Sequence, residues 1–451
     1  MATRYQRLDT ASALPGAQSP GWDLLLACIA VYLATAVGRI HEVFPVLLYF
    51  KPTLLAAVMS IGLYLLQQSP QRRMGLLQSR TTLCLIGLVV WGALSVPAAL
   101  NQGLAFNSWT DFARTIAMCF VVAASVRRPS DVERLFLVYF SVTVAYTAVV
   151  LSRFQLGAGN WRLGDLYTYD ANDLATLITT AMPFGLYFVI GQRRLGWRLL
   201  AVGGLIVLAV GLIRSGSRGG LVAFLAVAAF VLVGMTTIPA RSRVVGLTVI
   251  LVVLVGTASD KYWSEMQTIV HYKQDYNVTS ETGRVRIWTR GIGYMAGHPL
   301  FGVGMRNFNV AEGTISPLAR LRERGIGVWW GAAHNTYIQV GAELGVPGLL
   351  LCLGAIITAL LSLGRVSRRA LRAHPEGSQV SRLAQSLMAA LVGFAVGSFF
   401  LSLAYADMLY MLIALAIGLV KCTRLSSVDY ASDSQSPPFS PIARARGGPR
   451  V

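Results

Sequence analysis

Charged residues are scarce in this chain. They make up 13% of its 451 residues, while 55% are hydrophobic, whereas roughly a quarter of the residues of a soluble globular domain are charged. Acidic residues are the scarcer kind, because 20 Asp and Glu stand against 39 Lys and Arg, for a formal net charge of +19. This composition excludes a soluble globular protein and predicts a polytopic membrane protein.

Cysteine and metal-binding patterns are lacking as well. The five cysteines lie in or at the ends of apolar runs, without the spacing of metal ligands, so we interpret them as small core residues. The sequence has no Asp-x-Asp pair and no cluster of outward carboxylates of the kind that holds a divalent cation. It has no recognised nucleic-acid-binding module. We therefore expect no metal, no cofactor and no nucleic-acid partner.

Long apolar runs are abundant. A helix needs about 20 mostly apolar residues to cross the hydrocarbon, and about twelve runs qualify, which predicts an all-α fold with about twelve transmembrane helices. The second and tenth runs are long enough to be tilted or broken. The runs lie at about 21–38, 43–66, 81–99, 111–126, 131–152, 172–191, 197–214, 219–236, 243–259, 334–363, 384–403 and 406–422.

The distribution of Lys and Arg predicts the topology. These residues are concentrated in one alternate set of the gaps between runs, and the short gaps of the other set are nearly free of them, which places both termini in the cytoplasm. We expect a cytoplasmic segment at 1–20, a transmembrane domain at 21–422 and a disordered cytoplasmic tail rich in Ser, Pro, Arg and Gly at 423–451.

One long polar loop, at about 260–333, falls on the outer side although it is rich in arginine. The orienting rule is weak for long loops, so the topology stands, but cations on this side need another explanation. An anionic ligand is the simplest one. The loop's cations are Lys261, Lys273, Arg284, Arg286, Arg290, Arg306, Arg320, Arg322 and Arg324.

Within this loop, residues 284–296 have the period of a helix. We expect a helix in the membrane interface, with its start capped by Ser280 or Thr282. Arg284 would project from the first turn, where free N–H groups favour an anion. The alternative is a helix that only binds lipid headgroups. The predicted apolar face carries Val285, Trp288, Ile292 and Met295, and the opposite face carries Arg286 and Arg290.

His334 closes the loop where the tenth apolar run begins. The unperturbed pKa of imidazole lies nearest neutral pH, so we predict that His334 is a general base; the alternative is an ordinary interfacial polar residue. Glu343 follows about two turns later, and we expect a structural anchor. We also expect His298, which is followed by proline, to close the interfacial helix, before a tight turn at 302–304.

Two further polar segments face outward. The turn at 214–220 combines two arginines, Arg214 and Arg218, with two serines and three glycines, which predicts a compact anion clamp. The alternative is a plain Gly-Ser turn. Asp170 and Asn172 open the sixth run, and there we favour helix capping by Asn172 over a chemical role.

Four motifs together resemble the O-antigen ligase and O-antigen polymerase superfamily. They are the Ser-x-Ser-Arg-Gly-Gly turn at 215–220, the Asp-x-Asn-Asp-Leu-Ala start at 170–175, the block from Gly-Arg to Gly-Val-Gly at 283–304, and the block from His-Asn-Thr-Tyr to Glu-Leu-Gly-Val-Pro-Gly at 334–348. Each motif alone is weak. Their shared order and predicted side of the membrane make the resemblance specific.

The resemblance implies a GT-C-type glycosyltransferase of the bacterial inner membrane, with its active site facing the periplasm and a glycan on undecaprenyl pyrophosphate as donor. Ligases of the superfamily join the glycan to lipid A-core, polymerases join it to another repeat unit, and protein O-oligosaccharyltransferases, which typically carry an extra C-terminal domain, transfer it to serine. Matched by motif, the essential groups are the catalytic His334 and the substrate-binding Arg218 and Arg284, with Arg214, Arg286 and Arg290 as companions.

The residue types suit this chemistry. Undecaprenyl pyrophosphate is a good leaving group, so the enzyme needs cations for the developing charge and a base for the acceptor hydroxyl. Arginine binds phosphate through two hydrogen bonds and stays charged, which predicts metal-independent, inverting transfer. A transporter or lipid flippase, the rival from another class, would need ionisable groups near mid-membrane, and few are present. A polymerase differs only in its acceptor; the outward arginine excess suits phosphorylated core sugars and favours a ligase.

Overall fold

The computed structural model describes residues 21–67, 69–153, 162–163, 169–191, 194–271, 273, 275–280, 282–322, 331–373 and 379–433. All secondary-structure elements in these ranges are helices, which confirms the predicted all-α fold. The α-helices are α1 (Leu24–Ala36), α2 (Pro45–Leu48), α3 (Pro52–Leu66), α4 (Arg80–Ser95), α5 (Gln102–Ser125), α6 (Pro129–Arg153), α7 (Ala171–Gly191), α8 (Leu195–Ser215), α9 (Arg218–Gly234), α10 (Ala240–Thr257), α11 (Asp260–Gln267), α12 (Tyr276–Thr279), α13 (Arg284–Gly297), α14 (Phe308–Thr314), α15 (Pro317–Arg322), α16 (Thr336–Ala373), α17 (Gln379–Gly397) and α18 (Asp407–Asp433). The 3₁₀ helices are η1 (Ile40–Val43), η2 (Pro70–Arg72), η3 (Met74–Leu76), η4 (Val96–Ala98) and η6 (Ser398–Phe400).

Eight of the described helices are long and apolar enough to cross a membrane. Helices α1, α3 and α9 have 13, 15 and 17 residues, and at about 1.5 Å per residue they are shorter than a hydrocarbon core of about 30 Å. Helix α5 is longer, but Asp111 and Arg114 lie near its middle. The chain is thus a multi-pass membrane protein with eight candidate spans among the described helices, and the number of about twelve stays a prediction.

The ends of the chain lie partly outside the described residues. Residues 1–20 and 434–451 are not described, and the predicted tail boundary at residue 423 falls within α18, which continues to Asp433. The tenth apolar run is broken, as expected: α16 has a non-helical Gly345 (φ 69°, ψ −171°) two residues before Pro347. The second run is broken at Lys51 (φ 43°), which separates α2 from α3.

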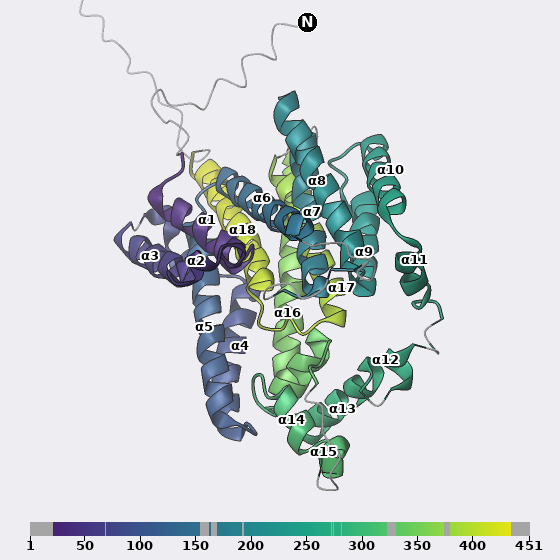
Figure 1. Ribbon diagram of the computed structural model, residues 1–451. Helices are drawn as coiled ribbons and strands as arrows, with labels where there is room; N and C mark the ends of the chain where they lie inside the picture. Colours follow the sequence, from purple (N-terminus) through teal and green to yellow (C-terminus); the bar gives the residue numbers. More distant parts are fainter. Residues whose placement is uncertain are drawn as a thin grey trace, which may run out of the picture.

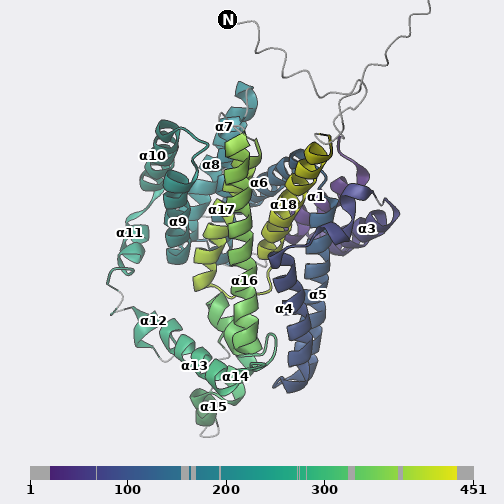
Figure 2. The same cartoon turned by 180° about the vertical axis from the view of Figure 1, so that it is seen from behind.

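Backbone hydrogen bonds join the break in α16 to the predicted glycine turn at residues 302–304. The N–H of Val303 donates to the carbonyl of Ala342 (2.8 Å), and the N–H of Val346 donates to the carbonyl of Pro299 (2.8 Å). Gly302 has a left-handed backbone (φ 66°), as the turn requires. Figures 1 and 2 show α13, α14 and α15 beside this part of α16, at the end of the molecule opposite to the C-terminal part of α18.

This arrangement predicts that Gly345→Ala destabilises the protein. A Cβ at Gly345 would lie 2.3 Å from the carbonyl oxygen of Leu300, and the left-handed backbone adds about 1–2 kcal/mol. The Tm of the detergent-solubilised variant is expected to fall. Gly62→Ala, where a Cβ meets nothing within 4 Å, is the control and should leave the Tm unchanged or raise it, since alanine favours a helix. Equal Tm values for the two variants would contradict this account.

At the other end, ion pairs join helices that are distant in sequence. Asp23, just before α1, contacts Arg72 of η2 and, at 3.1 Å, Arg127 between α5 and α6. Arg127 also pairs with the buried Asp131 of α6 (3.1 Å). The Nζ of Lys421 in α18 donates to the carbonyl of Ala124 (2.6 Å). The structure therefore gathers at one end the segments that the Lys and Arg distribution assigns to the cytoplasm.

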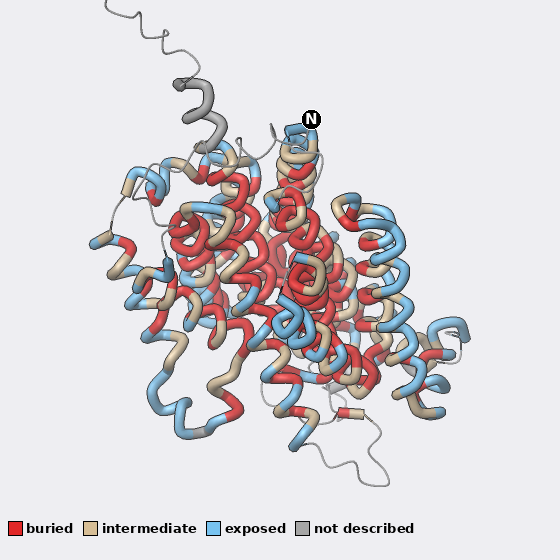
Figure 3. The backbone as a smooth tube through the Cα atoms, turned by 90° about the horizontal axis from the view of Figure 1, so that it is seen from above, coloured by how far each residue is buried: buried red, intermediate tan, exposed pale blue. Residues whose placement is uncertain are grey.

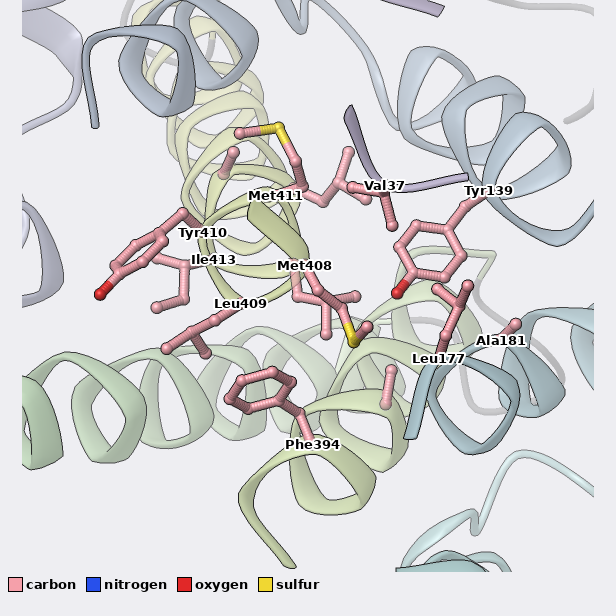
Figure 4. Packing of buried hydrophobic residues seen from close by; sticks show 14 of the residues in the cluster. Val37, Tyr139, Leu177, Ala181, Phe394, Met408, Leu409, Tyr410, Met411 and Ile413 are labelled. Atoms are coloured by element: carbon pink, nitrogen blue, oxygen red, sulfur yellow. The ribbon is translucent and has the colours of Figure 1, made fainter. Parts of the chain in front are cut away.

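The buried residues lie in the middle of the helix bundle, with exposed residues at its periphery (Figure 3). Helix α18 forms much of this core: Figure 4 shows Met408 and Leu409 of α18 close to Tyr139 of α6, Leu177 of α7 and Phe394 of α17. Because the start of α18 is enclosed in this way, the segment that precedes it, residues 401–406, has a fixed position against α16. That segment forms part of the site described next.

Candidate functional site

His334 lies directly before α16 and is held through its backbone. Its N–H donates to the hydroxyl oxygen of Ser402 (2.9 Å), and the side chain of Asn335 accepts from the N–H of Tyr337 (2.9 Å) and so caps α16. The backbone of His334 is left-handed (φ 47°), which costs a non-glycine residue about 1–2 kcal/mol. Such conformations cluster at functional sites.

Trp288 of α13 holds the same segment from a second side. Its indole N–H donates to the carbonyl of Ala333 (3.1 Å), and its ring packs edge-on against Phe399, with 5.5 Å between centroids. Because Ala333 precedes His334, α13 and the α17–α18 connection together hold the backbone of His334. Trp288 was predicted to lie on the apolar face of the interfacial helix; in the structure its N–H has a protein partner.

The predicted interfacial helix is present as α13, but it packs through another face. Ile287 and Tyr294 are buried, whereas Val285 and Ile292, on the predicted apolar face, are 41% and 52% exposed. These two exposed apolar side chains, on a helix whose other exposed residues are mostly polar, suit a position of α13 in the membrane interface. The periodicity of α13 could not predict which face packs, because that face is defined by contacts of Arg290 and Tyr294 with Glu312, which lies in another helix.

Arg284 and Asp170 act electrostatically on His334. Burial lowers the pKa of the His334 imidazole, the positive charge of Arg284 lowers it further, and Asp170 acts in the opposite direction. The net pKa is below the ordinary value, so the imidazole is neutral and able to accept a proton at neutral pH. The structure therefore brings together His334 and one of the two arginines predicted to be essential.

Arg218, the other arginine, is held by acidic residues. At the start of α9, its guanidinium contacts Asp275 and the hydroxyl of Thr268 (2.5 Å), and lies 3.5 Å from Glu265 of α11. Burial raises the pKa of Asp275, but hydrogen bonds from Arg218 and Asn277 outweigh it and leave that pKa lowered. Arg218 is thus oriented by carboxylates with which an incoming phosphate must compete.

The serines and glycines of the 214–220 turn serve the turn itself. Ser217 caps α9 by accepting from the N–H of Gly220 (3.0 Å), and Ser215 donates to a carbonyl of α8. Gly216 has a left-handed backbone (φ 58°). A Cβ at Gly220 would lie 2.5 Å from the Cβ of Ala175, so this glycine permits α9 to approach α7. These hydroxyls and glycines match the plain-turn alternative.

The three companion arginines differ in their surroundings. Arg290 forms an ion pair with the buried Glu312 of α14 (2.6 Å), and the hydroxyl of Tyr294 donates to the same carboxylate (2.6 Å). This pairing gives Arg290 a structural role between α13 and α14. Arg286 is exposed on α13, and Arg214 is half-buried at the end of α8.

Two predicted helix caps are replaced by neighbouring residues. The N-cap of α13 is Gly283, without a side-chain hydrogen bond, so the prediction of Ser280 or Thr282 is wrong. Asp170 caps α7, since its Oδ1 accepts from the N–H groups of the second and third helical residues (2.7 Å each). The prediction of Asn172 is also wrong: its Oδ1 accepts from Arg162 (3.1 Å) instead.

Glu343 is the expected structural anchor. It is buried, and its carboxylate accepts from the N–H groups of Arg306 (2.9 Å) and Phe308 (3.3 Å) and from the hydroxyl of Tyr405 (2.7 Å). These bonds fix the segment before α14 against α16. His298 directly follows the last residue of α13, as predicted.

A cavity of about 670 Å³ lies beside His334. Ala333, which precedes His334, and Ser402, which binds its N–H, both line the cavity. The other lining residues come from α1, α5, α7, α16, the start of α18 and residues 306–310. The charged residues of the lining are Arg39, Asp111, Asp173, Arg306, Glu343 and Asp407.

Sequence reasoning did not identify Arg39, Arg306 or Asp407 as site residues. They come from three distant parts of the chain, and only the packing of α1, α16 and α18 brings them to one cavity. A signal was present for Arg306, because it directly follows the predicted glycine turn on the arginine-rich loop. In the region that the structure describes, no group of three or more His, Cys, Asp or Glu is arranged to hold a metal ion.

A family model described as O-antigen ligase matches residues 203–353. Over this region the chain is similar to the O-antigen ligase family, as the four motifs predicted. No curated protein matches the chain. The matched region contains His334 and all five predicted arginines, whereas Arg39 and Asp407 of the cavity lie outside it.

Proposed function

We propose that this protein is an O-antigen ligase of the GT-C type, which transfers a glycan from undecaprenyl pyrophosphate to lipid A-core at the periplasmic face of the bacterial inner membrane. The observation that carries the proposal is the half-buried His334, whose pKa is lowered by burial and by Arg284, and whose neighbours Ala333 and Ser402 line a cavity of about 670 Å³. Similarity to the O-antigen ligase family over residues 203–353 supports a lipid-linked glycan donor.

In the proposed reaction, the oxygen of an acceptor hydroxyl attacks the anomeric carbon of the donor sugar. The carbon–oxygen bond to the diphosphate breaks, and its electron pair stays on the diphosphate oxygen. His334 accepts the proton of the attacking hydroxyl, and attack from the side opposite the leaving group inverts the anomeric centre. Arg284 and Arg218 would stabilise the charge that develops on the diphosphate, so that transfer needs no metal ion.

The lipopolysaccharide profile of a strain that lacks this chain tests the proposal. A strain without its ligase keeps full-length polymer on the lipid carrier and has none on lipid A-core. If the strain instead shows at most one repeat unit on lipid A-core, the protein is a polymerase. An unchanged profile would contradict both activities.

The pH dependence of transfer tests the role of His334. The base works as neutral imidazole, so the rate falls as the pH drops through its pKa, and the lowered pKa places this midpoint below about 6.5. Asp170→Asn removes a charge that raises the pKa, so the midpoint is expected to move to still lower pH. Asparagine is an equally good helix cap, and the Tm should be unchanged. A midpoint that stays in place would contradict the assignment.

A further inference from the structure

The cavity and the predicted diphosphate clamp are separate places. Neither Arg218 nor Arg284 lines the cavity. His334 lies between them: Arg284 acts on its imidazole, while Ser402, which holds its backbone, belongs to the cavity wall. A base between these two places can take a proton from an acceptor bound in the cavity while the donor is bound at the clamp.

The backbone of Arg306 holds this residue at the cavity. It has a left-handed conformation (φ 53°), and its N–H is bonded to the carboxylate of Glu343 (2.9 Å). Its side chain is exposed at the cavity and has no hydrogen-bond or ion-pair partner among the described residues. An arginine carries five N–H donors in a planar fork, so this side chain can bind an anion through two hydrogen bonds.

Arg39 adds a second cation. Its backbone is also left-handed (φ 46°), one Nη pairs with Glu42 (2.8 Å), and the guanidinium lies 5.2 Å from the centre of the Tyr169 ring. Its Nε is buried without a partner. A buried donor without an acceptor is destabilising, and an acceptor on a ligand would relieve this.

The carboxylates of the cavity decide which ligand fits. Asp111 pairs with Arg114 (2.9 Å), and Glu343 is satisfied by protein N–H and O–H groups. Asp407 accepts from the hydroxyl of Thr115 through Oδ1 (3.0 Å), and Asp173 accepts from the N–H of Asp170 through Oδ2 (3.3 Å). A carboxylate has about four acceptor positions, so both can also accept from the hydroxyl groups of a ligand in the cavity. Two carboxylates would repel a diphosphate, whereas they suit a hydroxylated sugar that carries one anionic group.

We propose that this cavity binds the acceptor sugar, with Asp173 and Asp407 accepting from its hydroxyls and Arg306 and Arg39 binding an anionic substituent on it, a phosphate or a carboxylate. The inference rests on the proposed function, because it requires an acceptor glycan. It adds the place where the acceptor binds and a charge requirement on the acceptor.

The test uses the full-length purified protein and its Arg306→Gln variant. The probes are undecaprenyl pyrophosphate and lipid A-core from a strain without O-antigen, the latter both native and after removal of phosphate with hydrofluoric acid. In Arg306→Gln, the concentration of native lipid A-core that gives half of the maximal rise in Tm should increase about 10-fold or more, as expected for the loss of a hydrogen bond to a charged group. Stabilisation by undecaprenyl pyrophosphate should be unchanged.

Lys51→Gln is the matched control. Lys51 is also a cation with a left-handed backbone (φ 43°), is exposed and does not line the cavity, so its variant should bind both probes normally. Arg39→Gln would break the ion pair with the buried Glu42 and could disturb folding, so Arg306→Gln is the deciding variant. Phosphate is the bound group if dephosphorylated lipid A-core binds wild type weakly; a carboxylate is the bound group if binding persists and still depends on Arg306.

Two results would overturn the inference. In the first, Arg306→Gln weakens binding of undecaprenyl pyrophosphate and spares lipid A-core, which would make the cavity the diphosphate site. In the second, the variant binds both probes like wild type. Failure of the proposed function looks different: wild type would ignore lipid A-core, while a lipid-linked repeat unit would stabilise it in an Arg306-dependent way.

Discussion

His334→Ala is expected to lower the rate of glycan transfer by about 10²- to 10⁴-fold, the usual cost of losing a general base. His334 is half-buried, the pKa of its imidazole is lowered, and its neighbours Ala333 and Ser402 line the cavity. The measurement is single-turnover transfer by purified protein from a lipid-linked donor to lipid A-core.

His298→Ala is the matched control. His298 lies on the same polar loop, its side chain is exposed, and its hydrogen bonds to Tyr294 and Gly302 run through the backbone. This variant should transfer at the wild-type rate. The base assignment is wrong if His334→Ala keeps near-normal transfer while its Tm and membrane insertion match wild type.

Arg284→Gln is expected to lower the rate by about 10²- to 10³-fold, the range observed when one preorganised donor to a developing negative charge is removed. Arg284 is the first residue of α13, where backbone N–H groups add to its charge, and it acts on His334. Arg284→Lys should also be impaired, because an ammonium cannot reproduce the planar fork.

Lys261→Gln provides the control for charge alone, since Lys261 is exposed on α11 of the same loop. It should retain full activity. Arg218→Lys is harder to interpret, because it also disturbs the contact with Asp275, so its Tm must be measured beside its rate. Full activity of Arg284→Lys would show that no two-pronged phosphate contact is made there.

Features set by local pattern were predictable from the sequence. The all-helical fold follows from the apolar runs, the breaks in the second and tenth runs follow from their length, and the glycine turn follows from residues that must adopt positive φ. The position of His334 directly before a long helix also follows, since Asn335 is a strong capping residue.

Features that depend on long-range packing were not predictable. The partner of Arg290 is Glu312, 22 residues away, and a helical wheel of α13 contains no sign of it. The caps at Asp170 and Gly283 differ from the predictions by a few residues, because several capping residues stand side by side and only the backbone path selects one. The cavity requires α1, α16 and α18 to meet, which no local motif encodes.

The left-handed backbone at His334 determines which substitution separates chemistry from folding. Alanine tolerates this conformation poorly, whereas asparagine adopts it more readily than most residues. His334→Asn would therefore keep the chain's path into α16 while removing the proton acceptor. A loss of turnover in that variant, with an intact unfolding transition, would isolate the contribution of the imidazole itself.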